Sequence, residues 1–292
     1  MVTVFTPVYN REKEILELYK SLLRQTSKDF EWIVVDDGSK DDIVDQMEKL
    51  IDETDSFTIR FFCQSNAGKH VAINKGVQMA KGEYFIIVDS DDYLVDNAIE
   101  TILAEFSNIP GDYAGIGLQR ITPQGLVIGK TFKGDFVDAT TSDRPKYGIE
   151  GDKAEVFFTH VMRRYPFPVF KGENFLSEAC VWYKMSADGL LIRWINKPAV
   201  VCEYLAGGLT DNSFSLALKN FEGSTYKANV MLKCKLPIET RIKTIGNYIY
   251  IGVKKRMPVS SLAKKIHISL PEAFMCYYLC ILKKALGNRK RC

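Results

Sequence analysis

Short apolar runs alternate with amphipathic segments over the first hundred residues, and few folds satisfy that order. The runs that are typical of strands buried on both faces are VTVF, WIVV, IRFF and YFIIV. The segments that place apolar side chains at helical spacing are 14–25, 43–51, 70–80 and 97–106. Strand followed by helix, repeated in this way, predicts an α/β fold with a mostly parallel sheet flanked by helices and joined by right-handed crossovers.

Each of the four apolar runs ends in a polar signature. These are TPVYN, DDGS, QSNAGKH and DSDD, in chain order. In an open parallel sheet the carboxyl ends of the strands border the ligand crevice. We therefore expect the four signatures to converge in space and to form one site.

The fourth signature places three carboxylates, Asp89, Asp91 and Asp92, within four positions at the end of a buried strand. Carboxylates this close repel one another, so the arrangement is costly unless a cation lies among them. Mg²⁺ or Mn²⁺ held by one or two carboxylates and substrate phosphates would offset that cost. Capping of the helix at residue 97 by Asp92 or Asp96 would explain one carboxylate but not three. The sequence therefore predicts a metal site here.

The other signatures offer groups for a nucleotide. The ring of Tyr9 could stack on a base and Asp37 could accept a hydrogen bond from a base or a ribose, although a strand cap and an Asp-Gly turn are the plain alternatives. Gly68 and Lys69 fall at an expected helix N-terminus, which can bind phosphate through its dipole and its N–H groups. An ordinary surface helix cap is the alternative for this segment.

The middle of the chain, residues 110–168, is irregular and rich in Gly, Asp and Lys, with one strand expected at 115–121. After it, GENFLSEACVWYKM predicts a helix, and IRWINKPAVVCEYLAGGLTDN predicts a strand that passes into a loop. Glu173 and Glu178 are candidate general bases on this helix. Glu178 is favoured because the apolar residues Ala179, Val181 and Trp182 follow it and would hold the helix against the sheet.

The charge of the chain is divided unevenly. From residue 233 to the end there are 14 Lys and Arg against 2 acids, a net charge of +12, whereas residues 1–232 carry 25 basic and 34 acidic side chains, a net charge of −9. The apolar run in SLPEAFMCYYLCILKKALGNRKRC is shorter than the roughly 20 residues that span a bilayer. An amphipathic helix on an anionic membrane surface fits it, with a packed C-terminal helix as the alternative. The interleaved Phe, Tyr and Leu favour lipid over nucleic acid, so no nucleic acid partner is expected.

The seven cysteines form no CxxC pair, and the opening VTVFTPVYNRE lacks a basic n-region and a cleavage site. These features favour a reducing cytoplasm. With the basic tail, they predict a cytoplasmic protein held peripherally at the inner face of the cell membrane.

In order and spacing, VTVFTPVYNRE, SLLRQTSKDFEWIVVDDGSKD and QSNAGKHVAINKGVQMAKGEYFIIVDSDDYL resemble the family-two inverting glycosyltransferases of GT-A fold. The resemblance covers residues 1–106. It extends more weakly to GENFLSEACVW and EYLAGGLTDN, which look like those of bacterial cell-surface polysaccharide transferases. The implied fold is a GT-A, Rossmann-like domain, here with a helical, basic C-terminal extension.

The resemblance implies a role for each matching position. For the donor, Thr6, Pro7 and Tyr9 would lie beside the base, and Asp37 would bind the uracil of a UDP-sugar. Asn66 and Lys69 would lie near the ribose and diphosphate. Asp89 and Asp91 stand at the DXD motif, where Asp91 would be the direct ligand of Mn²⁺ or Mg²⁺ and Asp89 would serve metal and nucleotide. Glu178 would be the base, although the family often has a Glu-Asp pair there and this chain has Ala179 in place of the Asp.

The implied reaction is a single displacement by the hydroxyl of a saccharide acceptor, lipid-linked at the membrane. We expect a nucleotide-sugar-binding half at 1–106, an acceptor-binding and catalytic-base half at 107–215, and a membrane-associating region at 216–292. One alternative is a sugar nucleotidyltransferase, which TPVYNRE disfavours because it is not a Gly- and Arg-rich loop. The other is a non-catalytic membrane-binding protein that retains the fold, which Asp37, Asp89, Asp91 and Glu178 disfavour.

Overall fold

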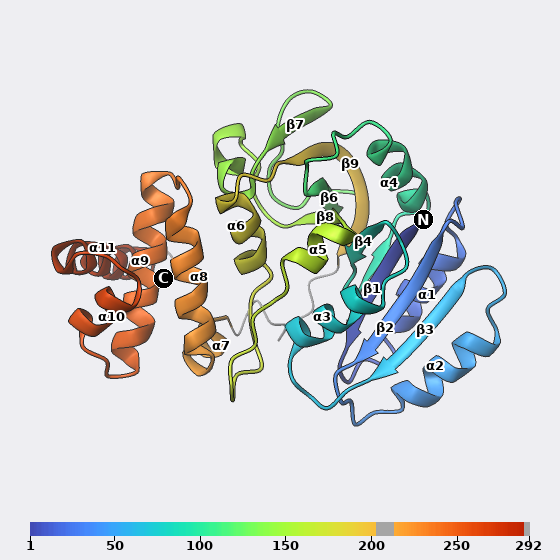
Figure 1. Cartoon of the computed structure of the whole chain (residues 1–292), viewed down its shortest axis with the longest axis horizontal. Coiled ribbons are helices and arrows are strands. Elements are labelled where there is room, and N and C mark those ends of the chain that lie inside the picture. The colour runs from blue at the N-terminus through green and yellow to red at the C-terminus, as the bar shows by residue number, and fades with distance from the viewer. Residues whose placement is uncertain (203–212, 289–292) are drawn as a thin grey trace.

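A computed structural model describes residues 1–202 and 213–288, and within them one nine-stranded sheet forms the centre of the protein (Figure 1). The strand order is β3-β2-β1-β4-β8-β6-β9-β5, with β7 paired to β9. The helical extension lies beyond one end of the sheet, away from β1, β2 and β3.

The first half of the sheet is the predicted parallel one. Its strands are β1 (Val2–Val8), β2 (Phe30–Asp36), β3 (Thr58–Cys63) and β4 (Tyr84–Ile87), all mutually parallel. The helices are α1 (Ile15–Leu23), α2 (Ile43–Asp52), α3 (Lys69–Met79) and, after the short strand β5 (Asp92–Leu94), α4 (Ala98–Phe106). The predicted alternation of strands and helices is therefore confirmed.

One detail of that prediction is wrong. IRFF belongs to β3, whose side chains are exposed or only partly buried, whereas those of β2 are fully buried. The reason is its position, because β3 is the edge strand and has β2 as its neighbour on one side alone.

The second half of the sheet mixes directions. Its strands are β6 (Gly115–Ile121), β7 (Phe136–Ala139), β8 (Lys153–Phe158) and β9 (Ile192–Cys202). The strand expected at 115–121 is β6, while β8 was not foreseen and runs antiparallel between β4 and β6. Overall β1–β4, β6 and β9 point one way and β5, β7 and β8 the other, so the mostly parallel α/β fold class is confirmed.

The short helices of this half are η1 (Thr141–Tyr147, a 3₁₀ helix), α5 (Thr159–Arg164) and α6 (Ala179–Ala187). The helix expected over GENFLSEACVWYKM begins only at Ala179, and residues 173–177 before it form a loop. As expected, Val181 and Trp182 are buried and hold α6 in the core. The predicted loop EYLAGGLTDN lies outside the described residues.

The extension is helical, as predicted. It consists of α7 (Ser213–Lys219), α8 (Phe221–Lys233), α9 (Ile238–Lys254), α10 (Val259–Lys265) and α11 (Leu270–Asn288). A cluster of buried apolar side chains of its own holds it together, separate from the core around the sheet. No helix in the described part of the chain is long and apolar enough to cross a membrane. The three predicted regions, with boundaries at 106 and 215, remain a proposal.

Candidate active site

The polar ends of β1 to β4 converge, as expected. The Asp37 carboxylate, after β2, accepts hydrogen bonds from the backbone N–H groups of Ala67 and Gly68, both at 2.8 Å. Asn10, after β1, donates its N–H to Ser39 Oγ, and its side-chain oxygen accepts from the Lys40 N–H, both at 2.8 Å. The turns after β1, β2 and β3 therefore form one continuous edge.

Gly68 joins a further segment to this edge. It has φ +97° at the start of α3, and a Cβ atom there would lie 1.9 Å from the carbonyl oxygen of Asn174. No L side chain fits this close approach, so glycine lets the loop before α6 reach the N-terminus of α3.

Lys69 stands at the centre of the site. Its Nζ lies 2.6 Å from Asp89 Oδ1 and 2.6 Å from Glu178 Oε1, and so it bridges the end of β4 to the start of α6. Burial alone would lower the pKa of Lys69, but Asp89 and Glu178 together raise it above its ordinary value. The lysine is therefore a fixed cation between the predicted metal ligand and the predicted base.

The three acids of DSDD have different surroundings. Burial would raise the pKa of Asp89, but Lys69 and Arg120 hold it below its usual value. Asp91 is partly exposed and lies 4.0 Å from the Arg11 guanidinium. Asp92 is buried 2.6 Å from Arg120, and burial raises its pKa to about 6.

The capping role considered for Asp92 or Asp96 is not found. Asp92 lies in β5, and Asp96 forms an ion pair with Arg24. The residue before α4 is Asn97, whose side chain makes no capping hydrogen bond, and the Ile99 N–H in the first turn donates instead to Gln25 Oε1 at 3.1 Å. Asp92 instead supports the site through Arg120, a residue that the sequence did not single out.

Asp89 and Asp91 offer the type of donor atom that a divalent cation prefers. They are carboxylates with hard oxygen atoms, at the crevice edge of β4, and neither is fully buried. Among the described residues no group of three or more His, Cys, Asp or Glu side chains could hold a metal by itself. Mg²⁺ commonly takes one or two carboxylates and completes its shell with substrate phosphates and water, so two acids suffice when a nucleotide is bound.

The residues predicted to bind the donor lie at the same edge but differ in access. Tyr9 is 45% exposed, and the side chain of Asn66 is also exposed. Thr6 is fully buried, and its hydroxyl accepts a hydrogen bond from the Trp32 indole N–H at 3.0 Å. Pro7, beside it in β1, is partly exposed. Of this set, Tyr9 and Asn66 present the most open surface to a ligand.

Asp37 is only 5% exposed. Its carboxylate also accepts from Gln64 Nε2 at 2.8 Å, in addition to the two backbone N–H groups. In this structure it therefore fixes the loop before α3. Its predicted contact with uracil remains a prediction.

The geometry separates the two candidate bases. The Glu173 oxygens accept the backbone N–H groups of Glu222 and Gly223, at 2.7 and 2.8 Å, and thereby cap the N-terminus of α8. Glu178 precedes α6 directly and is bound to Lys69. Glu178 is thus the glutamate that lies beside Asp89.

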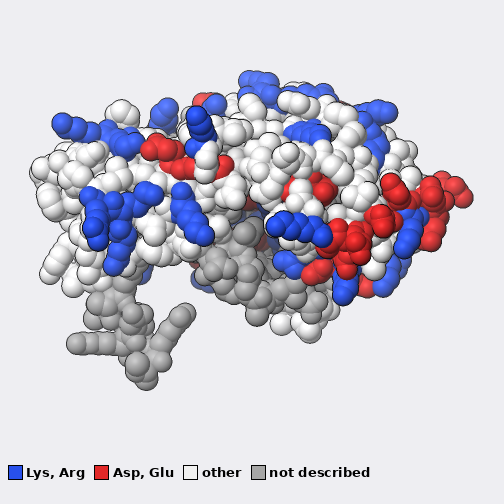
Figure 2. Space-filling view, turned by 90° about the horizontal axis from the view of Figure 1, so that it is seen from below, with Lys and Arg blue, Asp and Glu red and all other residues white. Residues whose placement is uncertain are grey.

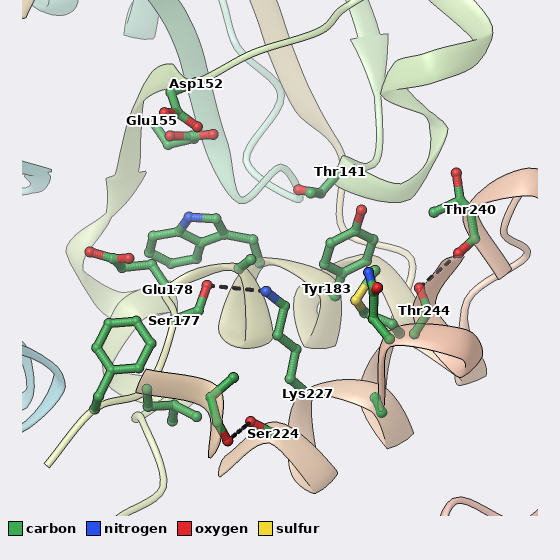
Figure 3. Close-up of a pocket in the computed structure, with 18 of the residues that line it drawn as sticks. Thr141, Asp152, Glu155, Ser177, Glu178, Tyr183, Ser224, Lys227, Thr240 and Thr244 are labelled. Carbon is green, nitrogen blue, oxygen red and sulfur yellow. Dashed lines mark hydrogen bonds between the residues drawn. The ribbon is translucent and has the colours of Figure 1, made fainter. Parts of the chain in front are cut away.

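A cavity of about 830 Å³ opens beside these residues, between the second half of the sheet and the helical extension. Lys69, Asp89 and Glu178 line it on one side, and α8 and α9 on the other. Figure 3 shows Lys227 reaching from α8 into this cavity, with its Nζ 3.4 Å from Ser177 Oγ. Lys227 could not be singled out from the sequence, since no motif surrounds it on α8.

Comparison with known proteins agrees with this arrangement. The family model described as glycosyl transferase family 2 matches residues 3–166. Glycosyltransferase GlyG of Streptococcus pneumoniae is 35% identical over 113 residues, which are 38% of this chain and 37% of GlyG. The chain matches well under half of the length of the first such relatives.

Two solved structures share the fold. S. aureus TarS 1–349, in complex with UDP-GlcNAc, has a TM-score of 0.64 at 20% identity and matches 87% of this chain and 72% of that one. Mannosyltransferase PcManGT from Pyrobaculum calidifontis, in complex with GDP-Man and Mn²⁺, has a TM-score of 0.56 at 15% identity and matches 99% of this chain and 79% of that one.

The fold and the convergent strand ends define a GT-A type α/β protein with a charged crevice at the carboxyl edge of its parallel strands. The family model covers more than half of the chain, and the chain belongs to glycosyl transferase family 2. This membership favours the transferase prediction over a nucleotidyltransferase.

Proposed function

We propose that the chain is an inverting glycosyltransferase that moves a sugar from a nucleoside diphosphate donor, a UDP-sugar, to a hydroxyl of a saccharide acceptor. One observation carries this proposal: Lys69 joins Asp89 and Glu178 in the lining of one large cavity. A donor-side acid and a base-side acid thus face one space that is wide enough for a saccharide.

In the proposed reaction, Glu178 accepts the proton of the acceptor hydroxyl. The acceptor oxygen forms a bond to the anomeric carbon as the bond from that carbon to the diphosphate oxygen breaks, and the configuration inverts. Lys69 would stabilise negative charge on the departing diphosphate, because its ammonium lies beside Asp89, the acid assigned to the donor side.

Asp91 and Asp89 would hold Mn²⁺ or Mg²⁺, which when bound supplies positive charge to the diphosphate. Two observations support this assignment. The pKa of Asp89 is held low by Lys69 and Arg120, so its carboxylate is charged at neutral pH. The family likeness also extends to the fold of a mannosyltransferase solved with Mn²⁺.

For the donor, we assign the base to the surface of Thr6, Pro7 and Tyr9, the uracil to Asp37, and the ribose and diphosphate to Asn66 and Lys69. The similarity to TarS, solved with UDP-GlcNAc, supports a UDP-sugar. In this proposal residues 1–106 bind the donor and residues 107–215 bind the acceptor and carry the base. The relatives, which include a chondroitin synthase, support a role in bacterial polysaccharide synthesis.

We further assign the extension to peripheral attachment at an anionic membrane, where a lipid-linked acceptor would lie. One side of α11 packs on the extension through Ala273 and Cys276, while Phe274, Met275 and Tyr278 on its other side are more than half exposed. Figure 2 shows Lys and Arg side chains with few acids over the helical extension, and acids gathered at the opposite end of the molecule. An apolar face with basic surroundings suits a lipid surface.

The donor assignment is tested by thermal unfolding with UDP and a set of UDP-sugars, each in Mn²⁺ and in a chelator. A bound donor stabilises the folded state by mass action, so UDP should raise the melting temperature, and more so with Mn²⁺. Asp91→Ala should remove the increment that Mn²⁺ adds. Asp96→Asn, an exposed acid of the same segment, is the matched control. If no nucleotide raises the melting temperature, the donor assignment is wrong.

A further inference from the structure

The cavity beside Glu178 has an uneven charge. Its cationic lining residues are Lys69, Arg120, Arg144, Lys153, Lys227 and Lys243. Its acidic lining residues are Asp89, Asp152, Glu155 and Glu178. Positive side chains therefore outnumber negative ones in the lining, and they differ in whether a partner within the protein neutralises them.

Four of the six cations have partners in the structure. Lys69 is bound by its two acids, and Arg120 by Asp92. Arg144 lies 3.8 Å from Glu155. Lys153 Nζ donates to two backbone carbonyl oxygens, at 3.0 and 2.9 Å. Each of these four groups therefore already has a partner within the protein, and none of them needs an anion from the acceptor.

Lys227 and Lys243 are the remaining two. Lys227 is partly buried, and its Nζ has a single long hydrogen bond, to Ser177, with no carboxylate of the described residues within 4.0 Å. Lys243, on α9 at the rim, forms no ion pair with any described residue. Burial lowers the pKa of Lys227; Cys180 and Glu178 oppose part of that shift, and the charge of Lys243 adds to it, so the two ammonium groups are close enough to repel. An ammonium group withdrawn from water without a counter-ion is costly, and a bound anion would offset that cost.

The position of Lys227 assigns the anion to the acceptor and not to the donor. Its contact, Ser177, directly precedes Glu178, whereas Asp89, the acid that we assign to the donor side, is linked to Glu178 through Lys69. A group that contacts Lys227 would thus belong to the molecule whose hydroxyl meets Glu178. The aromatic side chains of Trp182, Tyr183 and Tyr248 also line the cavity and offer apolar faces for sugar rings.

We propose that the cavity selects a saccharide acceptor that carries an anionic oxygen group, a phosphate or a carboxylate, near the hydroxyl to be glycosylated, with Lys227 as the counter-ion and Lys243 as a second cation at the rim. This inference rests on the proposed transferase function. It adds the chemical class of the acceptor, because a neutral acceptor would leave the Lys227 ammonium unpaired.

The test measures binding of three small probes to the full chain in the presence of UDP and Mg²⁺, which is diamagnetic, by nuclear magnetic resonance titration. The probes are methyl glucoside, methyl glucuronide and glucose 6-phosphate, which share a sugar ring and differ in charge. We expect the charged probes to bind roughly tenfold more tightly than the neutral one. The stronger of the two charged probes identifies the anion as carboxylate or phosphate.

Three variants make the test specific. Lys227→Met, which keeps the length of the side chain, should remove the preference for charged probes, and Lys227→Arg should restore most of it. Lys264→Met, an exposed lysine of α10, is the control and should leave the preference intact. Equal binding of neutral and charged probes, or an unchanged preference in Lys227→Met, would overturn the proposal.

UDP binding is measured in the same samples. A chain that fails to bind UDP refutes the transferase proposal, whatever its probe preference. A chain that binds UDP normally and shows no preference for charged probes refutes only the inference about the acceptor. UDP binding by Lys227→Met also reports that this variant is folded.

Discussion

Glu173 and Glu178 lie five positions apart, yet their carboxylates serve different purposes. Glu178→Gln should keep donor binding and lower turnover by about 10²- to 10⁴-fold, since the amide cannot accept the proton of the acceptor. Glu173→Gln should keep turnover and lower the free energy of unfolding by about 1 kcal/mol, because it weakens the cap of α8.

The two variants are compared by donor titration, steady-state transfer and urea unfolding. If Glu173→Gln alone lost turnover while remaining folded, the assignment of the base to Glu178 would be wrong.

We expect His70 to make the stability of the fold depend on pH. It is buried beside the site, its Nδ1 has no hydrogen-bond partner among the described residues, and burial lowers its pKa below the ordinary value of 6.5. As the pH falls through about 6.5, the unfolded chain takes up a proton that the folded chain resists, so stability is lost. Stability contributed by neutral His70 is therefore present above pH 6.5 and declines below it.

His70→Gln should reduce the slope of melting temperature against pH between about pH 6.5 and 5. The melting temperatures of His70→Gln and the unaltered chain are compared at each pH. The carboxylates are the same in both proteins, so their contribution to the slope cancels. Parallel curves would contradict the role given to His70.

At the scale of elements, the parallel half of the sheet could be predicted because its information is local. Each strand there is rich in apolar residues, and each is followed by a segment whose apolar residues recur at helical spacing. The carboxyl ends of parallel strands border one crevice, so the sequence predicted that the polar segments after these strands would converge. The contacts of Asp37 with Gly68 and of Lys69 with Asp89 are that convergence.

The second half could not be predicted in the same way. β8 begins with Lys153, which is buried only because its Nζ reaches two carbonyl oxygens, and its place between β4 and β6 depends on distant pairing. Likewise, Lys227 meets Ser177 across 50 residues of sequence. Contacts between segments far apart in the chain leave no periodic signal, so the side of the cavity that we propose for the acceptor could not be foreseen.

The packing of α11 on α9 depends on Gly246. A Cβ atom there would lie 2.6 Å from the Cys276 carbonyl oxygen and 2.7 Å from Cys280 Cβ. Gly246→Ala should therefore force the helices apart and lower the free energy of unfolding by about 1–3 kcal/mol. Urea unfolding measures this, with Gly111→Ala, which meets nothing within 4 Å, as the control. If Gly246→Ala unfolds at the same free energy as the unaltered chain, the close packing of α11 on α9 does not contribute to stability.

At the scale of the whole molecule, α9 links the cavity to the exposed face of α11. Lys243 and Asn247 on α9 line the cavity, while Gly246 packs against α11. A membrane bound by α11 would therefore lie within one helix layer of the proposed acceptor site. Since α11 contributes Ala273 and Cys276 to the core of the extension, deleting residues 270–292 would expose that core and would not test membrane binding cleanly.

Substitution of the exposed face alone is the sharper test. Phe274→Ser, Tyr278→Ser and Leu282→Ser together remove apolar side chains that are 52%, 63% and 40% exposed, so they should leave the fold intact. Burial of such side chains in lipid stabilises binding by about 1.5–3 kcal/mol each, and the triple variant should lose at least about tenfold in partitioning to vesicles of phosphatidylglycerol and phosphatidylcholine.

Cosedimentation with these vesicles measures the partitioning, and Leu126→Ser, at an exposed position on the sheet-containing part of the chain, is the control. Because residues 233–292 carry a net charge of +12, binding of the unaltered chain should also weaken as salt is raised or as anionic lipid is withdrawn. The apolar and the ionic contributions are then separable. If the triple variant partitions to vesicles as well as the unaltered chain, the exposed face of α11 serves another partner. If the triple variant partitions less but its remaining binding still weakens with salt, then α11 inserts into the lipid while the basic side chains attract the anionic headgroups.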